Sequence, residues 1–321
     1  MNSGRRWLTL PGRRRFECFL RGSGPELLVV HPGGPGFTGE YLSGLLALAR
    51  PGLRVLLLHP RGVGRSWAPS RPSAYTLAAH VRDLEAIRTA LRVDRMHLLG
   101  YSAGGFVALE YALKHPQRLR SLLLCGTAGS AEEIREANRI MLRAASPVQR
   151  RRLRSLTLLG AFGTPEYESL VEQIGRPFQT RFLPADSPPL GRLSPNVYRA
   201  MMTRTGDEFV VDGTLARWDA RSGYRRLRTP TLVLVGRFDF FLGAARRAAA
   251  AIPGAELIVL ARSSHMGPLE EPVAFRSAVD RFLRRVKPAR PGSSRPADPA
   301  RIAPSRRVGR TRPVRSVRGA R

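Results

Sequence analysis

Cysteine is almost missing from this sequence. Its 321 residues include only two, Cys18 and Cys125, which lie far apart in segments with the composition of strands. We expect both to be reduced core side chains, because the sequence has no cluster of histidine and cysteine with the spacing of metal ligands. This scarcity predicts no disulfide framework, no metal and no cofactor, and it favours a cytoplasmic location.

Long apolar runs are missing as well. No segment reaches the roughly 18 uninterrupted apolar residues that a membrane-spanning helix needs, so we expect neither an integral membrane protein nor a membrane partner. The pair Arg5–Arg6 is not followed by the apolar stretch of an export signal, because Arg13–Arg15 stands in its place. We instead expect two strands between Leu8 and Leu20, joined by a turn at Pro11–Gly12.

Acidic residues are few. The sequence has 24 Asp and Glu against 54 Lys and Arg, a formal net charge of +30, and Lys114 and Lys287 are its only lysines. The segment 287–321 is rich in proline, serine and arginine without apolar periodicity, so we expect a disordered basic tail. Such a tail can attract nucleic-acid phosphates but lacks interleaved aromatic residues for base stacking. Nucleic-acid binding therefore stays open as an alternative function of a different class.

The most informative motif that is present is Gly100-Tyr-Ser-Ala-Gly104, directly behind the apolar run Met96–Leu99. Small residues two positions either side of Ser102 permit a sharp turn from a strand into a helix. Such a turn presents the serine hydroxyl as a nucleophile, and the apolar periodicity after Gly104 predicts the following helix. The motif alone is a weak signal, and the predicted strand and helix around it strengthen it.

A second glycine-rich turn, His31-Pro-Gly-Gly-Pro-Gly36, follows the apolar run Leu27–Val30. A turn of this composition at the end of a strand leaves backbone N–H groups free to point at a bound carbonyl oxygen. Donors of this kind stabilise the negative charge that develops on that oxygen during acyl transfer. The sequence therefore predicts an oxyanion-binding loop here.

An acid and a base follow two later strands. Asp239 comes after the apolar, β-branched run Thr231–Val235, and His265 comes after the run Glu256–Leu260. Residues at the carboxyl ends of neighbouring parallel strands meet at one edge of the sheet, so we expect both near Ser102. The chain order serine, aspartate, histidine is the order found on one particular catalytic scaffold.

These residues resemble the α/β-hydrolase family, and more narrowly its proline iminopeptidase-like peptidases and their esterase relatives. The resemblance extends from Trp7 to Arg285. Its narrower markers are the Gly33–Gly36 turn and the Arg61–Ser66 loop. The segment from His265 to Pro272 is similar to a widespread hydrolase ending and is less specific to peptidases.

The resemblance implies a fold and a set of roles. The expected fold is α/β, with a mostly parallel central sheet flanked by helices and an inserted, mainly helical cap. Ser102 would be the nucleophile, Asp239 the acid and His265 the base, with the backbone N–H groups of Gly34 and Ala103 as oxyanion donors. In this mechanism the histidine deprotonates the serine, an acyl-enzyme forms, and water then hydrolyses it.

Three positions depart from the family pattern. His31 stands one residue further from the glycines, with Pro32 inserted between them. His59 occupies a position where an aspartate usually opens the second glycine loop, and Ser264 replaces the glycine that commonly precedes the histidine. None of these departures touches the expected triad.

The chain is expected to divide into a core and an insertion. No buried-strand pattern appears between Cys125 and Thr231, and helix-like stretches occupy much of that gap. We expect the core over residues 1–128 and 223–286, the helical cap over 129–222, and the basic tail over 287–321. The sequence singles out none of the cap's acidic residues for substrate binding; those available include Glu132, Glu133, Glu136, Glu166, Glu168, Glu172, Asp207, Glu208, Asp212 and Asp219.

Two substrate classes remain open at this point. The resemblance favours an aminopeptidase that releases N-terminal residues, proline above all, from small peptides. The same machinery also serves a carboxylesterase, a lactonase or another hydrolase of acyl or C–C bonds. An aminopeptidase needs carboxylates to hold the substrate's amino terminus, whereas a charge of +30 would repel cationic peptides unless the local cleft opposes it. Substrate-binding residues and oligomeric state are not predicted.

Overall fold

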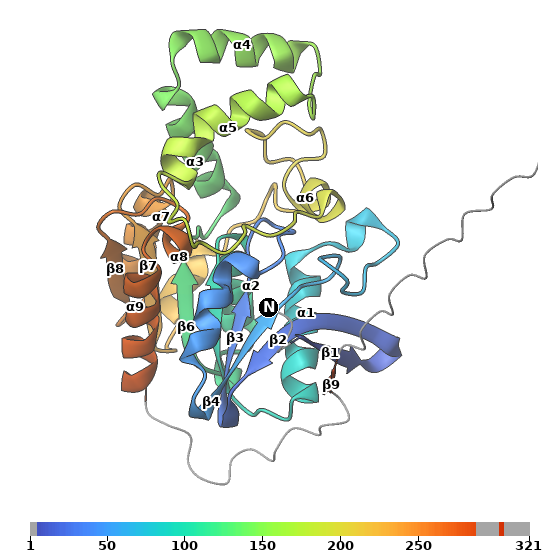
Figure 1. Ribbon diagram of the computed structural model, residues 1–321, viewed down its shortest axis with the longest axis vertical. Helices are drawn as coiled ribbons and strands as arrows, with labels where there is room; N and C mark the ends of the chain where they lie inside the picture. The colour runs from blue at the N-terminus through green and yellow to red at the C-terminus, as the bar shows by residue number, and fades with distance from the viewer. Residues whose placement is uncertain (1–4, 287–301, 305–321) are drawn as a thin grey trace, which may run out of the picture.

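A twisted sheet forms the centre of the protein, whose computed structural model describes residues 5–286 and 302–304 (Figure 1). The sheet has nine strands in the order β8-β7-β6-β5-β3-β4-β2-β1-β9. Strands β3 to β8 pair in parallel, whereas β1, β2 and β9 add an antiparallel edge. The strands are β1 Arg5–Leu10, β2 Arg14–Arg21, β3 Ser23–His31, β4 Pro51–Leu58, β5 Met96–Tyr101, β6 Leu119–Cys125, β7 Thr231–Gly236, β8 Glu256–Leu260 and β9 Ile302–Pro304.

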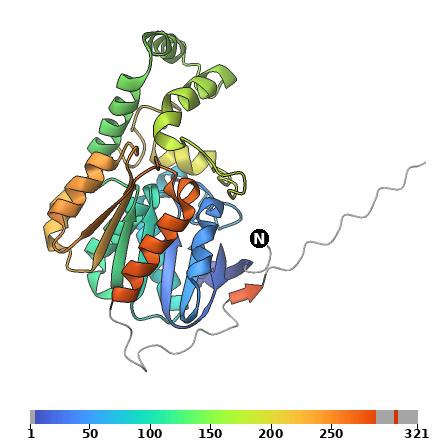
Figure 2. The same ribbon diagram turned by 60° about the vertical axis from the view of Figure 1, so that its left-hand side comes forward.

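Helices cover both faces of this sheet (Figure 2). Alternate residues of the strands pack toward opposite sides, so that Val29 and Leu98 lie in one cluster and Leu28 and Leu99 in the other. Burial on both faces explains why the parallel strands are almost continuously apolar. One cluster includes α1 Leu77–Ala90, α2 Ala103–Lys114 and α7 Leu242–Ala251; the other includes the 3-10 helix Glu40–Leu48 and α9 Pro272–Arg285.

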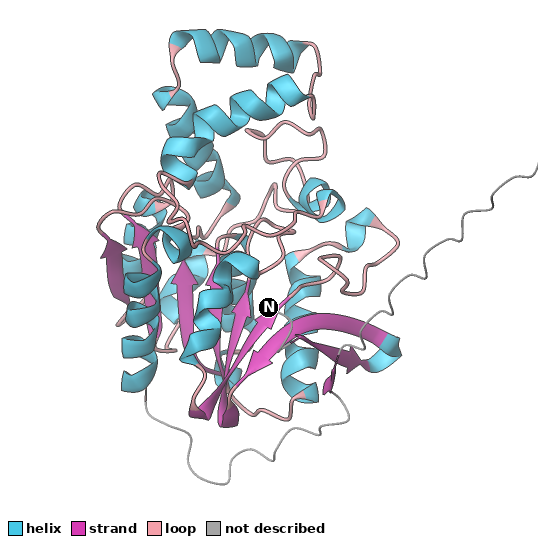
Figure 3. Ribbon diagram, viewed as in Figure 1, coloured by secondary structure: helices cyan, strands magenta, loops and turns pink. Residues whose placement is uncertain are grey.

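The segment between β6 and β7, residues 126–230, forms a separate, mainly helical layer above the carboxyl ends of the strands (Figure 3). We call it the inserted segment. A bridge between Ser130 and Asp219 joins its two ends at the base. Its helices are α3 Ala131–Ala144, α4 Pro147–Leu158, α5 Pro165–Gln179 and α6 Pro195–Met201.

Side-chain caps mark where these helices begin. The hydroxyl of Ser130 accepts from the N–H of Glu133 at the start of α3. Ser146 and Gln149 form a reciprocal capping box at the start of α4, where Pro147 occupies the first helical position. These caps satisfy N–H groups that have no partner within the helix, so the polar residues before each apolar pattern fix its first turn.

The structure confirms the predicted fold class and each predicted strand named above. Cys18 and Cys125 are free, buried thiols in β2 and β6, as expected. None of the helices described between residues 5 and 286 combines the length and apolarity that crossing a bilayer requires. The expected disordered tail lies outside the described residues apart from β9, and its proposed polyanion contacts stay untested.

Candidate active site

The expected catalytic residues lie at the carboxyl edge of the sheet. Register pairs His31 of β3 with Gly100 of β5, and Gly236 of β7 with Leu260 of β8, so these strands end at similar heights. The loops that leave them therefore meet above β5 and β6. This is the edge at which open α/β sheets bind their ligands.

Ser102 occupies a sharp turn between β5 and α2. It adopts a positive φ of 51° with ψ of −124°, a backbone conformation that is rare for residues with a side chain. A Cβ on Gly100 would lie 2.3 Å from the carbonyl oxygen of Gly104, and one on Gly104 would lie 2.2 Å from that of His31. Glycine is therefore required at both flanking positions, as the motif predicted.

His265 joins Ser102 to Asp239. The Oγ of Ser102 lies 3.0 Å from Nε2 of His265, and Nδ1 of His265 lies 3.0 Å from Oδ2 of Asp239. The other carboxylate oxygen of Asp239 accepts from the N–H of Phe241 at 2.8 Å, which fixes its orientation. The ring of Phe240 stacks on the imidazole at a centroid distance of 4.4 Å. The structure thus brings together all three residues that the sequence analysis selected.

The glycine-rich turn after β3 lies directly beside this serine. A Cβ on Gly33 would lie 2.6 Å from Cβ of Ser102, which shows how closely the two backbones approach. Gly34 has a φ of +118°, and the hydroxyl of Tyr41 accepts from the N–H of Gly33 at 2.7 Å. Ala103 is the first residue of α2, where backbone N–H groups have no partner within the helix. Gly34 and Ala103 are thus positioned on the two loops beside the hydroxyl.

A buried carboxylate holds the histidine loop. Glu270 accepts from the N–H of Ser264 at 2.7 Å, from its hydroxyl at 2.8 Å, and from the N–H of Arg181 at 2.7 Å. The N–H of His265 donates at 2.8 Å to the carbonyl of Phe178 near the end of α5. Ser264, one of the departures from the family pattern, therefore adds a hydrogen bond to a loop that the inserted segment also contacts.

His59, which departs from the family pattern, contacts the carboxylate of a residue on a neighbouring strand. Nδ1 of His59 lies 3.1 Å from a carboxylate oxygen of Glu17 on β2, and both side chains are buried. Burial raises the pKa of Glu17, but His59, the N–H of Arg65 and the charge of Arg5 outweigh it and lower the pKa to about 2. Glu17, which is hydrogen-bonded to His59 and paired with Arg5, therefore supplies a carboxylate beside the position where the family pattern has an aspartate.

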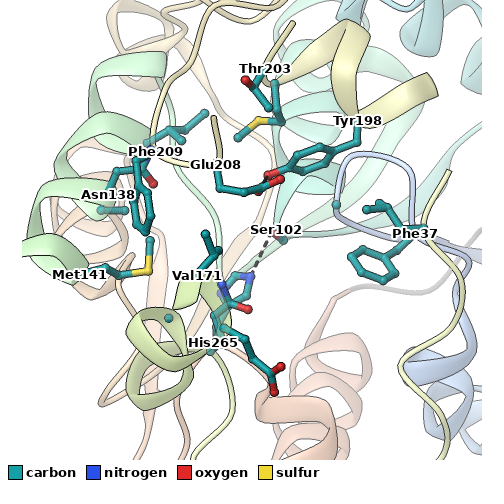
Figure 4. A pocket seen from close by; sticks show the side chains of 18 of the residues that line it. Phe37, Ser102, Asn138, Met141, Val171, Tyr198, Thr203, Glu208, Phe209 and His265 are labelled. Atoms are coloured by element: carbon teal, nitrogen blue, oxygen red, sulfur yellow. Dashed lines mark hydrogen bonds between the residues drawn. The ribbon is translucent and has the colours of Figure 1, made fainter. Parts of the chain in front are cut away.

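A cavity of about 640 Å³ opens above Ser102 and His265, between the sheet edge and the inserted segment. In Figure 4, Asn138, Met141 and Phe209 lie together on one side of the serine and Phe37 lies on the other. The volume falls within the range of small-molecule sites, and most of the lining is apolar. The charged side chains along its wall, besides His265, are Glu168, Glu172, Arg199 and Glu208.

Glu208 projects into this cavity toward Ser102, beside Tyr198 (Figure 4). The hydroxyl of Tyr198 donates to the carboxylate of Glu208, and the backbone N–H of Glu208 donates at 2.9 Å to the hydroxyl of Tyr167. Burial raises the pKa of Glu208, and the neighbouring charges of Asp207 and Glu168 act in the same direction, against the hydrogen bond from Tyr198. The site thus holds a half-buried carboxylate with no cationic partner among the described residues.

Sequence reasoning did not single out Glu208 from the other acidic residues of the predicted cap. Its neighbours in the chain, Asp207 and Phe209, give no periodic signal, and Tyr198 lies on α6 whereas Glu208 lies in the loop after it. Only the path of the inserted segment brings Tyr198 and Glu208 together over the serine. Within residues 5–286 and 302–304, no group of three or more His, Cys, Asp or Glu side chains is arranged to hold a metal ion.

Comparisons with known proteins agree with this geometry. The family described as the alpha/beta hydrolase fold matches residues 26–272. A proline iminopeptidase of Saccharolobus solfataricus is 30% identical over 275 residues, which cover 83% of this chain and 87% of that protein. A proline iminopeptidase of Levilactobacillus brevis is 29% identical over 269 residues, covering 82% and 90%.

A solved structure gives the same result. The crystal structure of the proline iminopeptidase of Mycobacterium smegmatis matches with a TM-score of 0.76 at 27% identity, covering 88% of this chain and 98% of that one. The family match and the curated relatives span most of the chain. The protein therefore belongs to the α/β-hydrolase family and is an enzyme, a hydrolase similar to the proline iminopeptidases.

Proposed function

We propose that the protein is a serine hydrolase that works through an acyl-enzyme. His265 takes the proton of Ser102 as the hydroxyl attacks the substrate carbonyl, and Asp239 orients the imidazole and stabilises its cation. The protonated imidazole then gives its proton to the leaving group. Water attacks the acyl-enzyme in the second half of the cycle, with His265 again acting as base. The two hydrogen bonds of 3.0 Å that join these side chains support the proposal.

The oxyanion would be held by the N–H groups of Gly34 and Ala103. The turn that holds Gly34 packs closely against Ser102, where Gly33 leaves room for the approach, and Ala103 begins the helix that directly follows the serine. Removing one such donor in enzymes of this type costs about 2.7 to 4 kcal/mol of transition-state stabilisation. Both donors are backbone groups, so the turn geometry, rather than any side chain, would create this part of the site.

The proposed substrates are short peptides with a free amino terminus, from which the enzyme releases the first residue, proline above all. The carrying observation is Glu208, a half-buried carboxylate that lines the cavity and projects toward Ser102. Burial and the charges of Asp207 and Glu168 raise the pKa of Glu208, and a cation bound beside the carboxylate would favour its ionised form. A substrate ammonium group supplies that cation and forms a charge-assisted hydrogen bond.

The charge of the cavity supports the same choice of substrate. Across the whole chain Lys and Arg outnumber Asp and Glu by 30, a field that repels cationic peptides. The cavity wall instead carries three glutamates, Glu168, Glu172 and Glu208, against the single arginine Arg199. The local sign is therefore opposite to the global one, which favours entry of an ammonium group.

Residues 129–222 are proposed to act as a cap that selects the substrate. The bridge between Ser130 and Asp219 closes the segment close to both predicted boundaries, and its helices α3, α5 and α6 supply much of the cavity wall. The two free thiols, Cys18 and Cys125, are compatible with the cytoplasm as the proposed compartment.

An esterase is the second candidate, because the cavity is mainly apolar and an acyl-enzyme mechanism accepts esters as well as amides. Hydrolysis of L-prolyl p-nitroanilide and of p-nitrophenyl acetate by the purified protein separates the two candidates. The Ser102→Ala variant gives the rate to subtract. Serine-dependent cleavage of the anilide is the expected result. Cleavage of the ester alone would assign an esterase, and no serine-dependent cleavage of either would refute the proposed mechanism.

A further inference from the structure

Helix α4 is the outermost element of the inserted segment and the one furthest from the sheet (Figures 1 and 2). Only one side of it packs against the protein, through Leu153 and Leu156, which are buried in a small cluster with α3 and α5. At 100° per residue, Val148, Arg151 and Leu158 point away from that buried side. We call this outward side, from Val148 to Leu159, the α4 face.

The α4 face holds a concentration of exposed apolar side chains. Leu159 is 79% exposed, Leu158 is 78% exposed and Val148 is 65% exposed. Among the large hydrophobic residues of the described chain, only Val273 on α9, at 64%, approaches these values. Single exposed leucines are ordinary, but three of the four most exposed large hydrophobic side chains of the described residues lie on this helix and its C-cap, and two of them are adjacent, which favours a contact surface here.

The same face is strongly basic. The helix has four arginines and no acidic residue, and within the described part of the chain only Arg152 of these four has a carboxylate partner, Glu166. Arg150 donates to backbone carbonyl groups of the α3–α4 turn. The side chains of Arg151 and Arg154 have no carboxylate partner among residues 5–286 and 302–304, and both are exposed. Leucines flanked by unneutralised arginines are the pattern of a helix that lies in the plane of a membrane interface.

We propose that the α4 face docks onto an anionic lipid surface, with α4 parallel to the bilayer, Leu158 and Leu159 entering the acyl region, and Arg151 and Arg154 contacting the headgroups. Anionic lipid complements the arginines, and the acyl region accepts the leucines. A second copy of this chain is a poorer partner, because two α4 faces would bring arginines against arginines. Nucleic acid would use the arginines but leave the leucines in water. From the sequence alone we expect no membrane partner, because no apolar run is long enough to span a bilayer. The proposed contact lies on the membrane surface and does not need such a run.

The test measures co-sedimentation of the full-length protein with vesicles of phosphatidylcholine alone and with 30% phosphatidylglycerol. The double variant Leu158→Ser/Leu159→Ser keeps every charge and the whole basic tail. We expect it to lower the partition coefficient on anionic vesicles about tenfold or more, since burial of a leucine side chain is worth more than this factor. The variant Val273→Ser, equally exposed on α9, is the matched control and should bind as the parent does.

The charge variant Arg151→Gln/Arg154→Gln should weaken binding about fivefold per arginine on anionic vesicles only. Circular dichroism and hydrolysis in free solution check that each variant is folded, because none of these residues lines the catalytic cavity. Three results would overturn the proposal. They are no binding to anionic vesicles, binding that the leucine variant leaves unchanged, or self-association in light scattering that requires the leucines.

Discussion

Replacing Glu208 by glutamine tests the proposed recognition of the substrate amine. The change removes the negative charge but keeps an oxygen that can accept from the hydroxyl of Tyr198, so the local packing is preserved. A hydrogen bond to a charged group contributes about 1.5–3 kcal/mol, which corresponds to roughly 10- to 150-fold in kcat/KM. We therefore expect kcat/KM for L-prolyl p-nitroanilide to fall within that range.

The assay compares this anilide with p-nitrophenyl acetate, which has no amino group. If Glu208 binds the amine, Glu208→Gln lowers kcat/KM for the anilide and leaves that for the ester within about twofold. Glu166→Gln provides the matched control, since Glu166 is an exposed carboxylate of the same segment that pairs with Arg152 outside the cavity. An equal loss on both substrates, or no loss on the anilide, would refute amine recognition by Glu208.

The pH dependence gives a second readout of the same residue. Burial, Asp207 and Glu168 raise the pKa of Glu208 above its ordinary value, so the carboxylate gains a proton at a higher pH than a solvated glutamate does. As pH falls through this raised pKa, the amine loses its partner and KM for the anilide should rise. The Glu208→Gln variant should lack this rise, whereas its ester kinetics should follow pH as the parent's do.

Three further substitutions test the scaffold. Gly104→Ala would place a Cβ 2.2 Å from the backbone carbonyl of His31, so we expect loss of folded protein, measured as the yield of soluble protein with a cooperative melting transition. The pKa of Glu17 is about 2 in the folded protein, below its unfolded value of 4.5. Its carboxylate therefore adds to the free energy of unfolding above pH 4.5, and this stabilisation is lost as pH falls toward 2. Glu17→Gln should therefore cost roughly 3 kcal/mol in urea unfolding at pH 7 and less than half of that near pH 3; an equal cost at both would contradict an explanation from the charge of Glu17. Glu270→Gln leaves a buried donor of Ser264 unpaired, so we expect the free energy of unfolding to fall by about 1–3 kcal/mol. We also expect a lower kcat with little change in KM. An unaltered kcat would show that this carboxylate does not position the histidine loop.

Much of the site was predictable because local rules act on short stretches of chain. The close backbone contacts around Ser102 demand glycine at Gly100 and Gly104, so the turn is readable from spacing alone. The strand before Asp239 is buried on both faces, and the edge strand before His265 is half-buried; the apolar run of each strand predicted where the side chain that follows it emerges. Chain order then assigned the two roles, and the structure brought the side chains to within 3.0 Å of their partners.

The support of these residues was not predictable. Glu17 contacts His59 across 42 positions of sequence, and Glu270 accepts hydrogen bonds from Ser264, six positions away, and from Arg181, 89 positions away. Contacts of this kind depend on which strands become neighbours and on the path of the inserted segment. No periodicity marks such residues, because each is a single polar side chain in a local context that fits many roles.

The sequence by itself determined the sheet, the serine turn, the glycine-rich loop and the order of the acid and the base. These depend on hydrophobic period and on steric demands between residues close in the chain. Only the tertiary structure decided which of the acidic residues of the predicted cap line the cavity and which helix exposes leucines beside arginines without a carboxylate partner. Both outcomes depend on burial and on neighbouring charge, which exist only once distant segments have packed together.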